Sequence, residues 1–143
     1  MKLGPRGEEL IKSYEKLELK AYLPTLNDRP TIGWGSTKGV KMGDVITINV
    51  ANELFKNDVA VAEKIVHRLN VPLTQAMFDS LTSLAFNTGT LGESIPEYLR
   101  SGDYYMACQS IFLWRKQAGR NLLGLARRRA REIQLFLEDG VNV

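Results

Sequence analysis

Apolar and polar positions along this chain repeat with two different periods. Residues 5 to 15 carry apolar side chains at helical spacing, and Pro5 suits the first turn of a helix. Residues 17 to 22 alternate between apolar and polar side chains instead, and residues 31 to 35 form a second short extended run with two glycines. The turn-rich segment 24–30 separates these runs, so the pattern predicts a helix followed by two short strands.

Helical spacing then continues to the end of the chain, interrupted by residues that begin or end helices. Thr47, Thr74 and Asp103 are suited to cap helix N-termini, whereas Pro72 and Gly89 are suited to end helices. The expected helices are a long one after Thr47, one from 74 to 89, a short one at 96–100, one after Asp103 and one at 123–137. The apolar face of the long helix is predicted to use Val50, Leu54, Ala62, Ile65 and Leu69, and that of the next helix Met77, Phe78, Leu81, Leu84 and Ala85.

These elements predict an α+β fold that is mostly α-helical. Residues 1–16 and 47–143 are expected to form a helical body, and residues 17–46 a small β-rich lobe near the N-terminus. With 143 residues, of which 44% are hydrophobic and 24% charged, the chain has the composition of one ordinary globular domain.

Composition excludes several kinds of site. Cys108 is the only cysteine and His67 the only histidine, which rules out an internal disulfide, a cysteine-based zinc site and a histidine cluster. We expect neither a metal nor a cofactor. A net charge of +3 favours an anionic partner, such as nucleic acid, an acidic membrane face or a cell-wall polymer, without choosing among them.

The chain shows no apolar run of signal-peptide or transmembrane length. We therefore expect synthesis in the cytoplasm and no stable membrane insertion. An extracellular target would require a separate route across the membrane.

Glu15 is the first candidate for chemistry, because a predicted hairpin follows the helix end on which it lies. A carboxylic acid partly walled off from water has a raised pKa and donates a proton near neutral pH, as glycoside cleavage requires. Thr31 offers a hydroxyl that orients an attacking water, although threonine also simply favours strands. Asp28 is the third candidate, although a turn aspartate usually bonds its own backbone.

Several stretches of the chain resemble phage-type lysozymes, glycoside hydrolase family 24. EKLELKAY at residues 15–22 and PTIGWG at 30–35 resemble the active-site segment of that family. Residues 73–89 are similar to its central helix, residues 102–114 to the helix before the last loop, and residues 124–136 to its closing helix. The matches occur in order and at family-like spacing.

The resemblance implies a muramidase that hydrolyses the β-1,4 bond between N-acetylmuramic acid and N-acetylglucosamine in peptidoglycan. Glu15 matches the catalytic glutamate, and Thr31 the threonine near the attacking water. Tyr22, Trp34 and Asn87 are expected to bind the glycan in a cleft between the lobes. The resemblance also implies a monomer that acts on peptidoglycan strands to lyse the host cell, leaving the host cytoplasm through a holin-type pore.

The chain departs from the family pattern at positions near the expected site. Pro24 stands where many members have an aspartate, and Asp28 is the only carboxylate left in that loop. Lys16 replaces a common glycine, and Ser36 replaces a frequent histidine. A second hypothesis therefore stays open, namely a lysozyme-fold protein that binds glycan or serves in a phage particle with weak or no catalysis.

A basic cluster on the last predicted helix invites a nucleic-acid interpretation. Arg127, Arg128, Arg129 and Arg131 have no interleaved aromatic residues, and the neighbouring apolar positions predict one side of an amphipathic helix. We therefore expect no nucleic-acid binding and a solvated face. The alternative is that one arginine is buried against a carboxylate, for which Glu132 is near.

Overall fold

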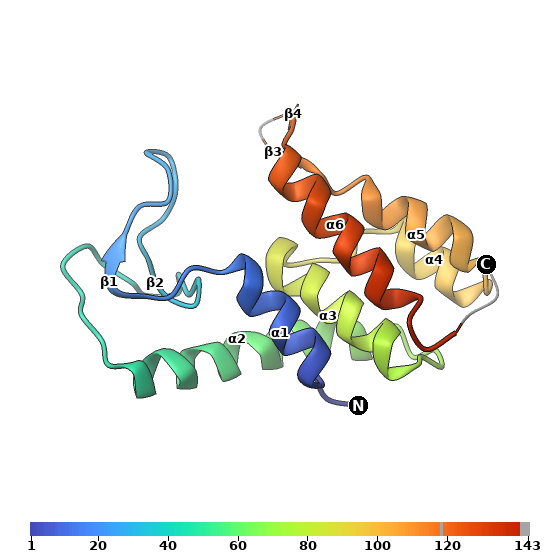
Figure 1. Ribbon diagram of the computed structural model, residues 1–143, viewed down its shortest axis with the longest axis horizontal. Coiled ribbons are helices and arrows are strands. Elements are labelled where there is room, and N and C mark those ends of the chain that lie inside the picture. Colours follow the sequence, from blue (N-terminus) through green and yellow to red (C-terminus); the bar gives the residue numbers. More distant parts are fainter. Residues whose placement is uncertain (118, 141–143) are drawn as a thin grey trace.

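The computed structural model describes residues 1–117 and 119–140, and within them it is mostly helical, with two small antiparallel strand pairs (Figure 1). The elements are α1 (Pro5–Tyr14), β1 (Glu18–Tyr22), β2 (Thr31–Gly33), α2 (Ile48–His67), α3 (Gln75–Thr88), α4 (Ser94–Arg100), α5 (Tyr104–Phe112), β3 (Lys116–Gln117), β4 (Arg120–Asn121) and α6 (Leu123–Phe136). Figure 1 shows the pair β1–β2 at one end of the molecule and the helical body at the other, with α2 running beneath both. The predicted α+β, mostly α-helical class is confirmed.

The β lobe is built around the antiparallel pair β1–β2. Glu18 lies opposite Gly33 and Tyr22 lies opposite Thr31, with a register shift between these two pairs. On the other edge of β1, the Ile46 N–H donates a 2.8 Å hydrogen bond to a main-chain carbonyl of the strand. This pairing brings the ends of β1 and β2 next to the loop that joins them.

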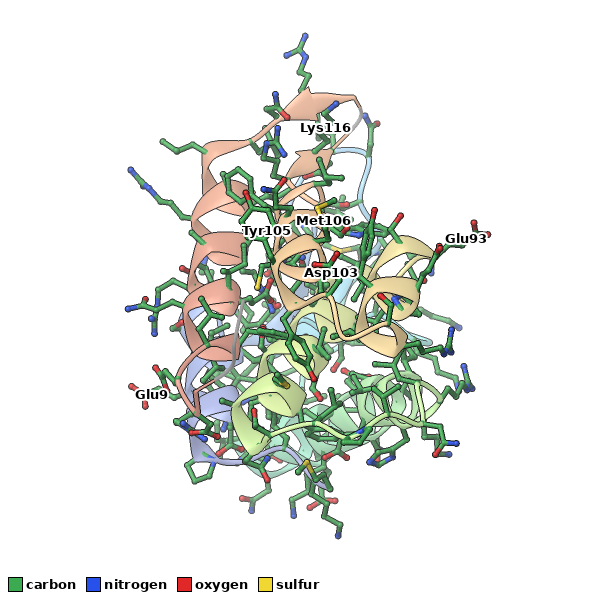
Figure 2. All side chains as sticks on the ribbon, turned by 90° about the vertical axis from the view of Figure 1, so that its right-hand side faces the viewer. Glu9, Glu93, Asp103, Tyr105, Met106 and Lys116 are labelled. Atoms are coloured by element: carbon green, nitrogen blue, oxygen red, sulfur yellow. The ribbon has the colours of Figure 1, made fainter. Side chains whose placement is uncertain are left out.

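Three predicted N-caps and the predicted end of α3 are confirmed, whereas the helix predicted at 96–100 begins earlier, at Ser94. The side chains of Thr47, Thr74 and Asp103 accept the backbone N–H three residues further on, at 3.2, 3.1 and 3.1 Å. Gly89 follows α3 in the left-handed conformation, with φ of 77°. Figure 2 shows Asp103 at the start of α5, beside the labelled Tyr105 and Met106.

Helix α3 lies at the centre of the body, packed by α1, α2 and α6. Every residue from 76 to 85 is buried, so the predicted apolar stripe is only part of the contact surface. Asp79, Ser80, Thr82 and Ser83 are also buried, because helices cover α3 on several sides at once. Asp79 finds partners in the Gly4 N–H and in a side chain of its own helix.

The predicted apolar face of α2 was wrong at several positions. Val50 is 43% exposed, and Leu54 and Ile65 are only half-buried, whereas Ala62 and Leu69 are buried as predicted. The other buried positions of α2 are Ala51, Phe55, Val59 and Val66. The buried face is shifted because α2 packs against both α3 and β2. Ala51 lies close beneath Gly33, where a side chain on the glycine would meet it at 3.5 Å.

The segment between α5 and α6 contains the short paired strands β3 and β4. Lys116 of β3 lies near the tip of this projection (Figure 2). Among the helices of the described ranges, none combines the length and the apolar character needed to span a bilayer.

Candidate active site

A cleft of about 830 Å³ lies between the β lobe and the helical body. Its walls come from the end of α1, from β1, β2 and the loop between them, and from the end of α3. The lining residues are Tyr14, Glu15, Lys16, Tyr22, Pro24, Asn27, Asp28, Arg29, Thr31, Gly35, Thr37, Phe86, Asn87, Thr88 and Gly89. Five of the six site residues predicted from the sequence are thus brought together here, and Trp34 is not.

Glu15 lies at the C-terminal end of α1, where its own N–H donates to the Ile11 carbonyl at 3.1 Å. That bond directs the side chain from the helix end into the cleft. The side chain is 19% exposed, and its Oε1 lies 3.2 Å from Nη1 of the buried Arg128. The carboxyl group therefore has one charged partner and little water.

Burial raises the pKa of Glu15 above that of an ordinary glutamate, and the negative charge of Asp58 raises it further. Arg128 opposes both effects, by its charge and by its hydrogen bond, but the pKa remains raised. The carboxyl group therefore keeps its proton to a higher pH than an exposed glutamate does. A protonated carboxylic acid in a cleft is the group that general acid catalysis requires.

Gly35 forms the floor under this carboxyl group. Its φ is +95°, and a Cβ on it would lie 2.7 Å from Oε2 of Glu15. Glycine is needed here both for the backbone conformation and for the close approach of the acid. Glu15 is thus held on one side by Arg128 and on the other by the Gly35 backbone.

Thr31 starts β2, opposite Tyr22 of β1, and its side chain is nearly buried. Its Oγ1 donates a 2.9 Å hydrogen bond to the Arg29 carbonyl. Because the hydroxyl proton is committed to that carbonyl, the lone pairs of Oγ1 are left to accept a hydrogen bond. Thr31 is therefore arranged to accept from a water molecule in the cleft.

Asp28 also lines the cleft, but on an exposed loop. Its Oδ2 accepts a 3.0 Å hydrogen bond from the Thr25 hydroxyl, and its N–H donates to the Thr25 carbonyl at 3.1 Å. These bonds belong to a local turn. The other carboxylate oxygen, Oδ1, is not used in them.

Tyr22 and Asn87 face the cleft from opposite lobes. Burial and the neighbouring Glu15 raise the pKa of the Tyr22 phenol, so it stays protonated and able to donate. The Asn87 Oδ1 accepts from Nη2 of Arg129, which leaves the amide NH₂ free to serve a ligand. Lys16 reaches solvent, where its Nζ lies 2.9 Å from the Glu18 carboxylate.

Trp34 points away from the cleft, contrary to the expectation that it binds glycan there. Its Nε1 donates to Asn52 of α2 at 3.2 Å, and its ring meets Phe55 edge-on at 6.4 Å. Trp34 lies in the turn after β2, and the positive φ of Gly33, 66°, ends the extended chain before it, so strand alternation does not set the direction of its side chain. The tryptophan therefore joins the lobe to α2.

Arg128 was missed as a site residue by sequence reasoning, which expected the basic cluster to be a solvated face. Arg128 and Arg129 are 4% and 0% exposed, and both lie against the fully buried Glu132. The alternative of an arginine buried against Glu132 is confirmed, and it holds for two arginines. The signal was the spacing of three and four residues between them and the glutamate.

No group of three or more histidine, cysteine, aspartate or glutamate side chains suited to a metal ion occurs within residues 1–117 and 119–140. The candidate chemistry of this cleft therefore rests on the carboxyl, hydroxyl, amide and guanidinium groups described above.

Comparison with known proteins identifies the family. The family model for phage lysozyme matches residues 12–132. This chain belongs to the phage lysozyme family. It is 36% identical to the endolysin of Acyrthosiphon pisum secondary endosymbiont phage 1, over 95% of this chain and 98% of that protein.

The chain is also similar to a longer relative and to a solved structure. The endolysin of Bacillus phage PZA is 38% identical over 95% of this chain, which spans only 55% of that protein. The muramidase domain of SpmX from Asticaccaulis excentricus superimposes with a TM-score of 0.83 at 33% identity, covering 95% of this chain and 97% of that one. This member of the phage lysozyme family therefore spans the whole length of some relatives and about half the length of others.

Proposed function

We propose that this protein is a muramidase that hydrolyses the β-1,4 bond between N-acetylmuramic acid and N-acetylglucosamine in peptidoglycan. Membership of the phage lysozyme family implies a peptidoglycan hydrolase. The observation that carries the finer assignment is Glu15, a carboxyl group of raised pKa held in the cleft between two lobes. Such a group can protonate the oxygen of a departing sugar.

In the proposed mechanism, Glu15 is the general acid. A glycan strand lies along the cleft with one glycosidic oxygen at the Glu15 carboxyl group, which donates its proton as the bond to that oxygen breaks. The positive charge that develops on the sugar ring must then be met by water or a carboxylate on the opposite face. Thr31 supports the first possibility, because its Oγ1 is left to accept a hydrogen bond from that water.

Asp28 is the group proposed to assist the water as a base. It is a carboxylate of the cleft lining and lies on the loop that leads into Thr31. Its Oδ2 is held by Thr25, which fixes the side chain while leaving Oδ1 to meet the water. Asp28 thus takes over, from a different loop position, the work of the aspartate that Pro24 replaces.

The cleft walls suit a polar polymer. Tyr22 offers a phenol donor from the β lobe, and Asn87 offers amide protons from the end of α3. Sugar hydroxyl and N-acetyl oxygens would accept these hydrogen bonds and fix the strand before proton transfer. We propose that the protein acts as a monomer for host cell lysis, and that it reaches the wall from the host cytoplasm through a holin-type pore.

A second candidate function is glycan binding, or a structural role in a phage particle, with weak or no catalysis. Two observations favour it: position 24 is a proline, and the turn bonds between Asp28 and Thr25 are those of an ordinary loop. In that case the cleft would hold a glycan strand without an efficient base for the water.

The test compares the wild-type protein with Glu15→Gln on permeabilised Gram-negative cells and purified sacculi. Turbidity loss and the release of reducing ends report cleavage, and circular dichroism confirms that both proteins are folded. Glu9→Gln is the matched control, because Glu9 is an exposed glutamate of the same helix (Figure 2).

We expect cleavage by the wild type and by Glu9→Gln, and none by Glu15→Gln. Full activity of a folded Glu15→Gln protein would refute the assigned acid. Binding to sacculi without release of reducing ends by any of the three proteins would establish the second candidate function instead.

A further inference from the structure

A carboxylate that lies outside the cleft pairs with two arginines, and each of these arginines contacts a residue that lines the cleft. Glu132 of α6 is completely buried where this helix crosses α3 (Figure 1). A buried carboxylate is costly unless it is paired, and here Arg128 and Arg129 provide the pairs. Two buried guanidinium groups around one buried carboxylate form a cluster that an amphipathic surface helix does not need for packing.

Both oxygens of Glu132 lie within ion-pair distance of an arginine, and only Oε2 also accepts hydrogen bonds. Its Oε1 lies 3.0 Å from Nε of Arg129. Its Oε2 lies 3.4 Å from Nε of Arg128 and accepts a 2.6 Å hydrogen bond from the Ser83 hydroxyl of α3. Each arginine thus contacts the glutamate through Nε, at one edge of its planar guanidinium group.

Terminal nitrogen atoms of the same arginines contact two residues that line the cleft. Nη1 of Arg128 donates to Oε1 of Glu15 at 3.2 Å, and Nη2 of Arg129 donates to Oδ1 of Asn87. Glu132 therefore contacts both arginines. Arg128 in turn contacts the proposed acid Glu15, and Arg129 contacts Asn87, a proposed glycan contact. A planar guanidinium transmits this constraint well, because its donors are fixed relative to one another.

The charges in the cluster affect how readily Glu15 holds its proton. The charged and titratable groups acting on Glu15 are Arg128 of α6 and Asp58 of α2, and Tyr22 of β1 is coupled to it. Arg128 favours ionised Glu15, whereas burial and Asp58 favour the protonated form. Glu132 contacts Nε of the same arginine, and its negative charge would offset part of the positive charge that favours ionised Glu15.

The pKa of Glu132 itself is raised by burial and opposed by both arginines and Ser83. Arg129, whose pKa is lowered by burial and by Arg128 and raised by Glu132, also interacts with Tyr14 of α1. When Glu132 is ionised, its negative charge offsets the positive charges of both guanidinium groups, so Glu15 is not their only counter-charge.

We propose that Glu132 is a positioning residue of the active site. It orients Arg128 towards Glu15 and Arg129 towards Asn87, and its carboxylate offsets the charge of the arginine that contacts the proposed acid. This inference rests on the proposed role of Glu15 as general acid. It assigns to a buried residue of α6 a part in proton donation.

The test measures kcat and KM against pH on a soluble peptidoglycan fragment. Glu132→Gln removes the charge and preserves the shape, whereas Glu132→Asp keeps the charge. In Glu132→Gln the positive charge of Arg128 is no longer offset by Glu132, so it lowers the pKa of Glu15 more strongly. We therefore expect this variant to move the alkaline limb of the kcat/KM profile to lower pH. At neutral pH the loss should be on the order of tenfold, and it should be recovered under acidic conditions.

Arg129→Met provides the opposite perturbation. It leaves Glu132 to pair with Arg128 alone, which should weaken the pull of Arg128 on Glu15 and move the alkaline limb to higher pH. It also removes the donor to Asn87, so KM should rise several-fold. Glu132→Asp should keep the limb close to that of the wild type, and Arg131→Gln, an exposed charge on the same helix, should leave the profile unchanged.

A purely structural role for Glu132 would lower the thermal stability of these variants without moving their pH profiles in opposite directions. Folded Glu132→Gln and Arg129→Met proteins with an unmoved alkaline limb would overturn the proposal. If Glu132→Gln does not fold, the limb of Arg129→Met decides the question. Retained activity of Glu15→Gln would instead overturn the proposed function, which separates the two failures.

Discussion

Replacing Gly35 with alanine should disable the site by displacing Glu15. The added Cβ would lie 2.7 Å from Oε2 of Glu15, and ordinary contacts begin at 3.4 Å. The carboxyl group must therefore recede by about 0.7 Å, or the backbone must leave its φ of +95°. A misplacement of this size in a catalytic group costs roughly a hundredfold in rate.

The same substitution carries a backbone cost that is separate from catalysis. A side chain at positive φ is unfavourable by roughly 1–2 kcal/mol, which should lower Tm by a few degrees. Gly43→Ala is the matched control, because Gly43 has a φ of +99° and nothing within 4 Å of its added Cβ. Both variants should lose similar stability, and only Gly35→Ala should lose activity.

The assay is the release of reducing ends from sacculi, measured with thermal unfolding of the wild type and both variants. We expect a loss of roughly a hundredfold in kcat/KM for Gly35→Ala and less than about threefold for Gly43→Ala. If the two folded variants retained equal activity, the contact between Gly35 and Glu15 would not matter for catalysis.

Three further predictions concern the cleft and the core. Because the pKa of Glu15 is raised in the folded state, its contribution to stability is present at low pH and is lost as pH rises through that pKa. The Tm of Glu15→Gln, relative to that of the wild type, should therefore increase with pH. A difference in Tm that does not change with pH would contradict this. Asp28→Asn should slow cleavage on the order of a hundredfold if Asp28 is the base, whereas Thr25→Val, which removes only the turn bond, should cost far less; an effect of Asp28→Asn below about threefold would assign the aspartate to the turn. Leu84→Ala, at a fully buried position of α3, should lower the free energy of unfolding by about 2–5 kcal/mol in denaturant titration, against less than about 0.5 kcal/mol for the exposed Val61→Ala, and equal losses would show that α3 is not the centre of the core.

Five of the six site residues predicted from the sequence line the cleft, and Glu15, Tyr22 and Thr31 among them belong to one continuous segment. Local patterns place such residues relative to one another through a helix end and a hairpin. The same reasoning misplaced Trp34, since its contact with α2 depends on how the lobe meets a distant helix. It also missed Arg128, which lies 113 positions from Glu15 along the chain.

The ends of the helices were decided by local chemistry. Thr47, Thr74 and Asp103 each bond an N–H three residues away, and Gly89 adopts a left-handed conformation that few other residues tolerate. These interactions span a single turn, so the sequence contains all that is needed to predict them. The retained glycine and glutamate positions of the family pattern are visible in the same way.

Burial was decided by the packing of helices that are distant in sequence. The approach of α6 to α3 turns Arg128, Arg129 and Glu132 from an expected solvated face into the buried support of the cleft. The protonation of Glu15 has the same origin, because its raised pKa depends on burial and on charges from α2 and α6. Desolvation depends on everything that surrounds a group, and no window of sequence contains those surroundings.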